Sequence, residues 1–67
     1  MKPLMRLLDL FEGKKSALAK ALGVSPAFIT LLVQNKRKIS YKLAIKAEKL
    51  SNGTVNRAEL RPDIWGD

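Results

Sequence analysis

The sequence predicts an all-α domain: a compact bundle of four helices and a short fifth. Three observations support this. Apolar residues recur at helical spacing in successive segments, Gly and Ser-Pro signals separate those segments, and strand-like alternation is nearly absent. A chain of 67 residues has room for one domain, 1–67, because so short a chain buries only about 60% of its unfolded surface. Residues 63–67 could form a flexible tail.

The first expected helix runs from Pro3 to Glu12, with proline in its opening turn and Gly13 as its stop. Met5 and Leu10 fall beside its apolar stripe, so we expect them to be partly buried at its edge. The stripe itself follows i, i+3, i+4, i+7 and predicts packing against a core; it comprises Leu4, Leu7, Leu8 and Phe11.

The stretch from Lys15 to Gln34 predicts two short helices joined by a tight turn. Gly23 can adopt the left-handed conformation that ends the first of them, Ser25 suits an N-cap, and Pro26 suits a first helical position. The second helix should run from Pro26 to about residue 35. Its inward stripe would be Ile29, Leu32 and Val33, and its separate outward face Ala27, Thr30, Leu31 and Gln34.

Composition excludes several functional classes. The chain has no cysteine and no histidine, so it lacks disulfides, thiolate metal ligands and the commonest general base. We therefore expect no enzyme, no cofactor and no metal site. The longest uncharged stretch, residues 21–34, is too short to span a bilayer, and no secretion signal is evident, so we expect a cytoplasmic protein without a membrane partner.

The net charge of +7 is concentrated in the middle of the chain. Residues 14–49 carry nine lysines and arginines against Glu48 alone, which is +8, whereas residues 1–13 sum to zero and residues 50–67 to −1. A polyanion such as double-stranded DNA is the natural partner, because neutralising phosphates releases condensed counterions. A solvated, solubilising surface is the alternative.

At this point the chain resembles the helix-turn-helix of the Cro and repressor family of phage and bacterial regulators. The likeness lies in spacing: Ala19, then Gly23 four residues later, Ile29 six after that, and Leu32 three further on. It implies a lambda-repressor-like or Cro-like domain and a phage or prophage transcriptional repressor that occludes a promoter. An ordinary αα-hairpin inside a helical domain is the alternative.

The resemblance also implies roles for individual side chains. The helix 26–35 would enter the major groove, where an amide can pair with adenine and small apolar groups can contact thymine methyls. Phe28 stays open between core and groove. Expected base contacts are Ala27, Thr30, Leu31 and Gln34.

Phosphate contacts are expected at the start of the second helix and in the basic loop after the third. Lys14 and Lys15 depart from the family, where Thr and Gln are common; lysine cannot cap a helix, so Ser16 is a substitute cap. The loop 35–38 could instead be a solvated charge run. The expected phosphate contacts are Lys14, Lys15, Ser16, Ser25, Lys36, Arg37, Lys38 and Lys42.

A fourth helix should begin after Ser40 as N-cap and end at Asn52-Gly53. We expect the Tyr41 ring to pack on the domain rather than reach a phosphate, and Lys46 and Lys49 to face solvent. The expected apolar stripe is Leu43, Ala44, Ala47 and Leu50.

The C-terminal segment favours a short helix over a β-hairpin. Asn56 and Glu59 have the spacing of a capping box, and Pro62 should close the helix off. Only Thr54 and Val55 favour a strand, the ending found in some Cro proteins. The stretch 53–65, GTVNRAELRPDIW, also resembles the end of the YdaS-type antitoxin group of small Cro-like regulators.

We expect a homodimer on DNA, with a monomer possible in the free protein, because one short helix reads too few base pairs to mark an operator. The regions of Val55 and Ile64-Trp65 are the candidate interfaces. An antitoxin-like module acting mainly through a protein partner, at Ile64 and Trp65, is the alternative function.

Overall fold

The computed structural model describes residues 2–66, and this part of the chain contains six helices and no strand. The predicted all-α class is confirmed, as is a helical C-terminal segment in place of a hairpin. The fifth helix ends before Pro62, as predicted, but Pro62 also opens a sixth helix that the sequence did not predict. The helices are α1 (Pro3–Asp9), α2 (Lys15–Leu22), α3 (Pro26–Val33), α4 (Tyr41–Leu50), α5 (Arg57–Leu60) and α6 (Pro62–Trp65).

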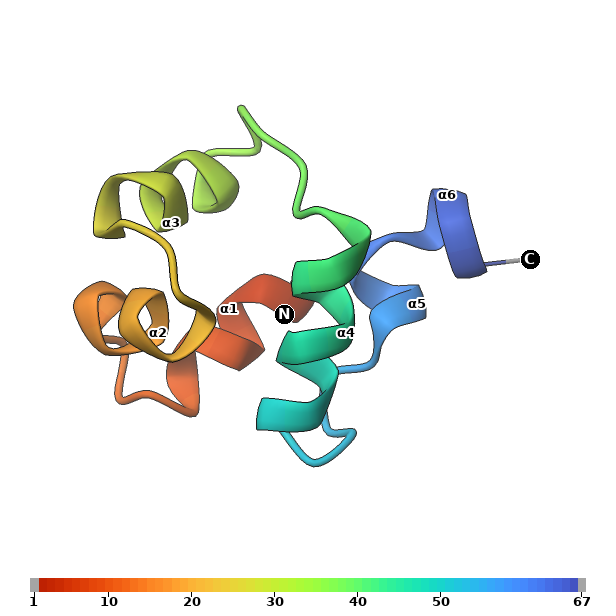
Figure 1. Ribbon diagram of the computed structural model, residues 1–67, viewed down its shortest axis with the longest axis horizontal. Coiled ribbons are helices and arrows are strands. Elements are labelled where there is room, and N and C mark those ends of the chain that lie inside the picture. The colour runs from red at the N-terminus through yellow and green to blue at the C-terminus, as the bar shows by residue number, and fades with distance from the viewer. Residues whose placement is uncertain (1, 67) are drawn as a thin grey trace.

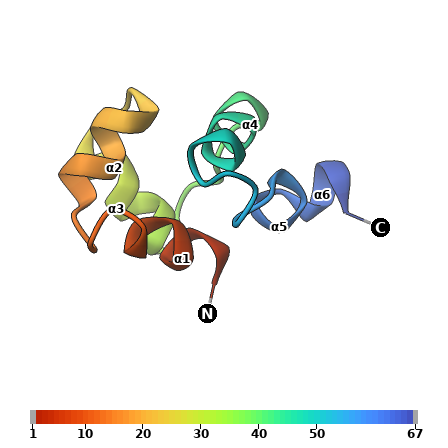
Figure 2. The ribbon, with the colours of Figure 1, turned by 90° about the horizontal axis from the view of Figure 1, so that it is seen from below.

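The helices fall into two groups on either side of α4 (Figure 1). α2 and α3 lie together at one end and contact each other extensively, while α5 and α6 lie at the other end, beside the C-terminus. In the second view, α1 lies below α4 and contacts both α3 and α5 (Figure 2). The N-terminal helix therefore connects the two groups.

The core lies where α1, α2, α3 and α4 meet. The predicted inward stripes are largely confirmed, but Leu10, Leu50 and Tyr41 are 52%, 41% and 51% exposed, so the prediction that they pack is wrong. Leu10 follows the last residue of α1, and Leu50 and Tyr41 are the terminal residues of α4. Buried apolar side chains are Leu7, Leu8, Leu18, Ala19, Leu22, Ile29, Leu32, Ile39, Ala44, Ala47 and Val55.

Each of the first four helices ends in the same way. One to three residues past the helix, a residue takes a left-handed conformation, and the next N–H donates to the carbonyl five residues back, as in a Schellman motif. α1 ends at Asp9 and α3 at Val33, earlier than residues 12 and 35, the expected boundaries. The left-handed residues that precede these bonds are Glu12, Gly23, Asn35 and Asn52, and the bonds run from the N–H of Gly13 to Leu8, Val24 to Ala19, Lys36 to Leu31 and Gly53 to Glu48.

The predicted N-caps are confirmed at three helices. Ser25 Oγ accepts the Phe28 N–H at 3.2 Å, and Ser40 Oγ accepts the Leu43 N–H at 3.2 Å. A complete capping box opens α5. The prediction that Ser16 caps α2 is wrong: Lys14 occupies the N-cap position without a side-chain bond, and Ser16 lies inside the helix.

Ion pairs attach α5 to both neighbours. Glu48 of α4 accepts the Arg57 backbone N–H at 2.8 Å and pairs with its guanidinium at 3.0 Å. Arg6 of α1 donates to Glu59 at 2.6 Å. These bonds lower the pKa of both carboxyl groups, through the Arg57 hydrogen bond at Glu48 and the Arg6 hydrogen bond at Glu59. A helix too short to be stable alone is thereby held on the domain.

Candidate nucleic-acid interface

α2 and α3 form a helix-turn-helix. The chain bends by 107° between them, within the range of about 90–120° that this motif adopts. Gly23 makes the turn at φ +78°, and Ala19, the small residue of α2, is 1% exposed. Lys46 is exposed, as expected, and its Nζ also donates to the Leu22 carbonyl at 3.4 Å, at the C-terminal end of α2.

The two faces of α3 differ in burial as predicted. Ile29 is fully buried and Leu32 is 6% exposed. On the other face Ala27 and Gln34 are exposed, whereas Thr30 and Leu31 are only half-exposed. Gln34 is the C-cap of α3. Phe28, which the sequence left open, packs partly buried against the core, so it is a packing residue.

Thr30 and Lys15 connect the two helices of the motif at this surface. The Thr30 hydroxyl donates to the Pro26 carbonyl at 3.3 Å and lies 3.4 Å from Lys15 Nζ, which donates to it. A predicted phosphate-contacting lysine therefore stands next to a predicted base-contacting residue. Lys14 and Ser16 are also exposed, and Lys14 forms a solvent-exposed pair with Glu12 at 3.5 Å. Such a pair contributes little and can exchange for a phosphate.

The basic loop, Lys36–Lys38, follows α3 directly and is exposed throughout. Ile39, 5% exposed, anchors the end of the loop in the core, and Ser40 then caps α4. Lys42, in the first turn of α4, is exposed too. The exposed cations thus lie at the start of α2, in the loop that follows α3 and at the start of α4.

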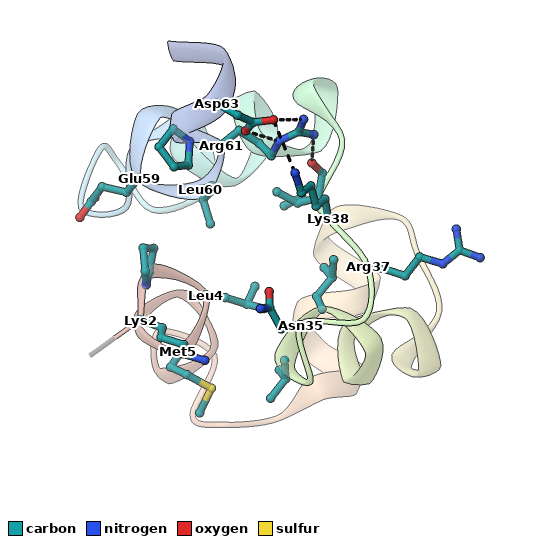
Figure 3. A pocket seen from close by; sticks show the side chains of 15 residues that line it. Lys2, Leu4, Met5, Asn35, Arg37, Lys38, Glu59, Leu60, Arg61 and Asp63 are labelled. Carbon is teal, nitrogen blue, oxygen red and sulfur yellow. Dashed lines mark hydrogen bonds and ion pairs between the residues drawn. The ribbon is translucent and has the colours of Figure 1, made fainter. Parts of the chain in front are cut away.

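One pair of residues that acts on this loop, Arg61 and Asp63, was not predicted from the sequence; we call it the clasp. Arg61 Nη1 donates to the Ile39 carbonyl at 2.7 Å, and its guanidinium pairs with both oxygens of Asp63 at 2.7 and 2.8 Å (Figure 3). Lys38 Nζ lies 3.9 Å from Asp63. The Arg61-Pro62-Asp63 tripeptide is the sequence feature from which this pair could have been predicted.

The clasp shifts the titration of its carboxyl group. The Arg61 hydrogen bond is the main cause that lowers the pKa of Asp63 from 3.8 to about 2, with smaller contributions from the Arg61 and Lys38 charges. The same hydrogen bond raises the pKa of Arg61. Asp63 is therefore ionised at neutral pH and holds Arg61 against the loop.

The residues that the sequence suggested for a protein interface differ in how far they are buried. Val55 is fully buried, so it is wrong as a dimer contact. Trp65 is partly buried and lies under Arg57, whose guanidinium carbon is 5.6 Å from the ring centre. Ile64 is 45% exposed. Residues 62–65 form α6, so the tail proposed for 63–67 is helical as far as Trp65, and Asp67 lies outside the described residues.

Metal sites and membrane spans are both absent from residues 2–66. No cluster of acidic, histidine or cysteine side chains there is arranged to hold a metal ion. No single helix in this range has the length and apolar composition of a membrane span; α2 and α3 meet those criteria only as a pair, across the 107° bend.

Comparison with known proteins identifies the family. The model of the family described as bacterial toxin YdaS matches residues 5–67. A prophage transcriptional regulatory protein of Escherichia coli (strain K12) is 32% identical over 57 residues, which cover 85% of this chain and 86% of that protein. A candidate transcriptional regulator of the same strain, YdaS, is 36% identical over 52 residues, 78% of this chain and 53% of its own length. No solved structure matches with significance. The chain therefore belongs to the family described as bacterial toxin YdaS.

Proposed function

We propose that this chain is a sequence-specific double-stranded DNA-binding regulator of transcription, a Cro-like prophage repressor that binds a two-fold operator as a homodimer. The observation that carries the proposal is the outward face of α3 together with the exposed cations around it: Lys14 and Lys15 at the start of α2, the basic loop after α3, and Lys42 in α4. Lys15 contacts Thr30 of that face at 3.4 Å. Two curated relatives named as regulators of transcription support it.

In the proposed complex, α3 lies in the major groove and reads bases with Ala27, Thr30, Leu31 and Gln34. Gln34 is exposed and free to pair bidentately with adenine, and the methyl groups of the other side chains can contact thymine. Backbone phosphates would be bound by Lys14, Lys15, Ser16, Ser25, Lys36, Arg37, Lys38 and Lys42.

The test compares two substitutions after selecting a preferred site from random duplexes. Gln34→Ala should cost about 1–3 kcal/mol on that site and almost nothing on random DNA, because it removes a base contact. Lys36→Ala with Arg37→Ala should weaken both duplexes alike, because phosphates carry no base identity. Lys20→Ala with Lys49→Ala, two exposed lysines outside the proposed surface, is the charge-matched control.

The salt response separates this proposal from a merely solvated basic surface. A dimer making about 6–10 phosphate contacts should lose roughly 10³–10⁵ in affinity between about 50 and 200 mM salt. Binding that is independent of salt, or equal losses in the loop variant and its control, would contradict the proposed interface.

An antitoxin-like module acting through a protein partner is the second candidate. The exposed Ile64 side chain favours it, but Trp65 is engaged with Arg57 and packs against the core, so only part of the expected patch is available.

A further inference from the structure

A groove opens between α1, the basic loop and the α5–α6 segment (Figure 3), and none of the outward-face residues of α3 lines it. Its volume is about 330 Å³, which is near the lower end of the roughly 300–1,000 Å³ typical of ligand pockets. The apolar part of the wall is formed by Leu4, Met5, Leu32, Val33, Ile39 and Leu60.

The charged side chains at the groove differ in whether they already have a close ionic partner. Its two carboxylates are already committed: Glu59 pairs with Arg6 at 2.6 Å, and Asp63 pairs with Arg61 at 2.7 Å. The remaining cations of the rim are exposed. Lys38 has only a 3.9 Å contact with Asp63, and among the described residues no ion pair involves the side chains of Lys2 and Arg37.

We propose that this groove docks a segment of an acidic protein partner, with apolar side chains inserted between α1 and Leu60 and carboxylates placed against Lys2 and Lys38. An amphipathic helix with apolar anchors at i, i+3, i+4 and i+7 suits an apolar groove with a charged rim. The complementary charge accelerates association and orients the segment.

A second copy of this chain fits the groove poorly. A two-fold contact places the same patch of each copy against the other, so the cations Lys2, Arg37 and Lys38 of both copies would be brought into one interface. With a net charge of +7 on each copy, repulsion opposes that arrangement. An acidic partner meets the same cations with attraction.

Docking would also regulate DNA binding, a consequence that rests on the proposed function. Arg37 and Lys38 belong both to the groove lining and to the proposed phosphate contacts. In Figure 3, Lys38 is turned toward Asp63, while Arg37 extends outward from the rim. A bound acidic segment would engage Lys38 and place negative charge next to the DNA backbone, so the partner and DNA should exclude each other.

The probe is a fluorescent synthetic peptide of about 14 residues, with leucines at the anchor positions and glutamates elsewhere. Peptides with serine replacing leucine, or lysine replacing glutamate, are its controls. We expect the full-length protein to bind the first peptide at least about tenfold more tightly than either control. Backbone amide shifts should centre on Leu4, Met5 and Leu60. Equal binding of the serine peptide would overturn the proposal, because the apolar wall would be unused.

Charge-matched variants distinguish docking from general attraction. Lys2→Gln with Lys38→Gln should weaken peptide binding about tenfold, and Lys20→Gln with Lys49→Gln should change it by less than about twofold. All four lysines are exposed, so neither pair should unfold the protein. Equal effects would overturn the groove as the site. Concentration-dependent shifts at Leu60 without peptide would instead identify a second copy as the occupant.

Competition with a selected DNA duplex tests the regulatory consequence separately. The peptide should lower the apparent DNA affinity, and simultaneous binding of peptide and DNA would overturn the exclusion. If the protein bound no DNA, the proposed function would fail, while the peptide titration would still decide whether the groove docks an acidic segment.

Discussion

At the scale of single residues, Ile29 and Thr30 are neighbours in α3 with opposite surroundings. Ile29 is fully buried among the helices. The Thr30 side chain is half-exposed, and its hydroxyl bonds only the Pro26 carbonyl and Lys15. Because the two positions share one helix and one turn, they allow a controlled comparison between folding and DNA recognition.

Ile29→Ala should lower the free energy of unfolding by about 2–5 kcal/mol, since truncating a fully buried side chain leaves a cavity. Thr30→Ala should lower it by no more than about 1 kcal/mol, since the lost hydrogen bonds are exposed to water. Urea denaturation followed by circular dichroism measures both. Equal losses would mean that the two faces of α3 are assigned wrongly.

The Asp63 carboxyl group should report on the clasp through pH. Its folded pKa of about 2 lies below its ordinary value of 3.8, so the pair with Arg61 stabilises the fold above about pH 4 and ceases to do so as the pH falls toward 2. Asp63→Asn should melt at a lower temperature than the wild type at about pH 5, and the difference should disappear near pH 2.

The carboxyls of Glu48 and Glu59 also have a lowered pKa, so both proteins should lose stability in acid. Only the difference between wild type and Asp63→Asn isolates the clasp. A difference that stayed constant over the whole pH range would show that the variant acts through packing and not through the carboxylate charge.

At the scale of elements, the short helices α5 and α6 depend on contacts with longer ones. α5 is held by Glu48 of α4 and by Arg6 of α1. In α6, Trp65 packs against the core and under Arg57, whereas its neighbour Ile64 is 45% exposed. This difference within one turn predicts different consequences of truncation.

Trp65→Ala should destabilise the protein by on the order of 2 kcal/mol, which is below the roughly 3–5 kcal/mol expected for a fully buried tryptophan. Ile64→Ala should change the melting temperature little, because its side chain is largely in water. Thermal melts of both variants provide the measurement. If Ile64→Ala were the more damaging change, α6 would pack through the opposite face.

At the scale of the whole molecule, size limits how two copies can share an operator. The domain measures 32 × 25 × 22 Å, whereas half-sites one helical turn apart are separated by roughly 34–36 Å. Two copies bound on one face of the duplex would therefore lie close together, and a modest contact between them could make binding cooperative.

Binding to two half-sites about 10 base pairs apart should be cooperative, and inserting about five base pairs should abolish the cooperativity by turning one site to the opposite face. Footprinting together with analytical ultracentrifugation on DNA with one or two half-sites measures this. Full affinity of a single protein on an isolated half-site would contradict the homodimer.

Local chemistry was enough to predict much of the fold. Ser25-Pro26 and Ser40 start helices by bonding their own backbone, and Gly23 turns the chain because it tolerates a positive φ. These signals depend on a few adjacent residues, and a buried stripe such as Ile29 and Leu32 needs only helical periodicity. For the same reason the amino-acid sequence alone locates the helix-turn-helix and the outward residues of α3.

Contacts between distant segments could not be predicted in this way. Arg61 reaches the Ile39 carbonyl across 22 positions of the chain, and Arg6 reaches Glu59 across 53. From the sequence alone, both arginines are equally compatible with solvated surface charges, and Val55 is equally compatible with an exposed apolar residue. Their partners are brought near only when α5 and α6 fold back on α1 and α4, so the burial of Val55, the clasp and the groove are consequences of packing and not of local pattern.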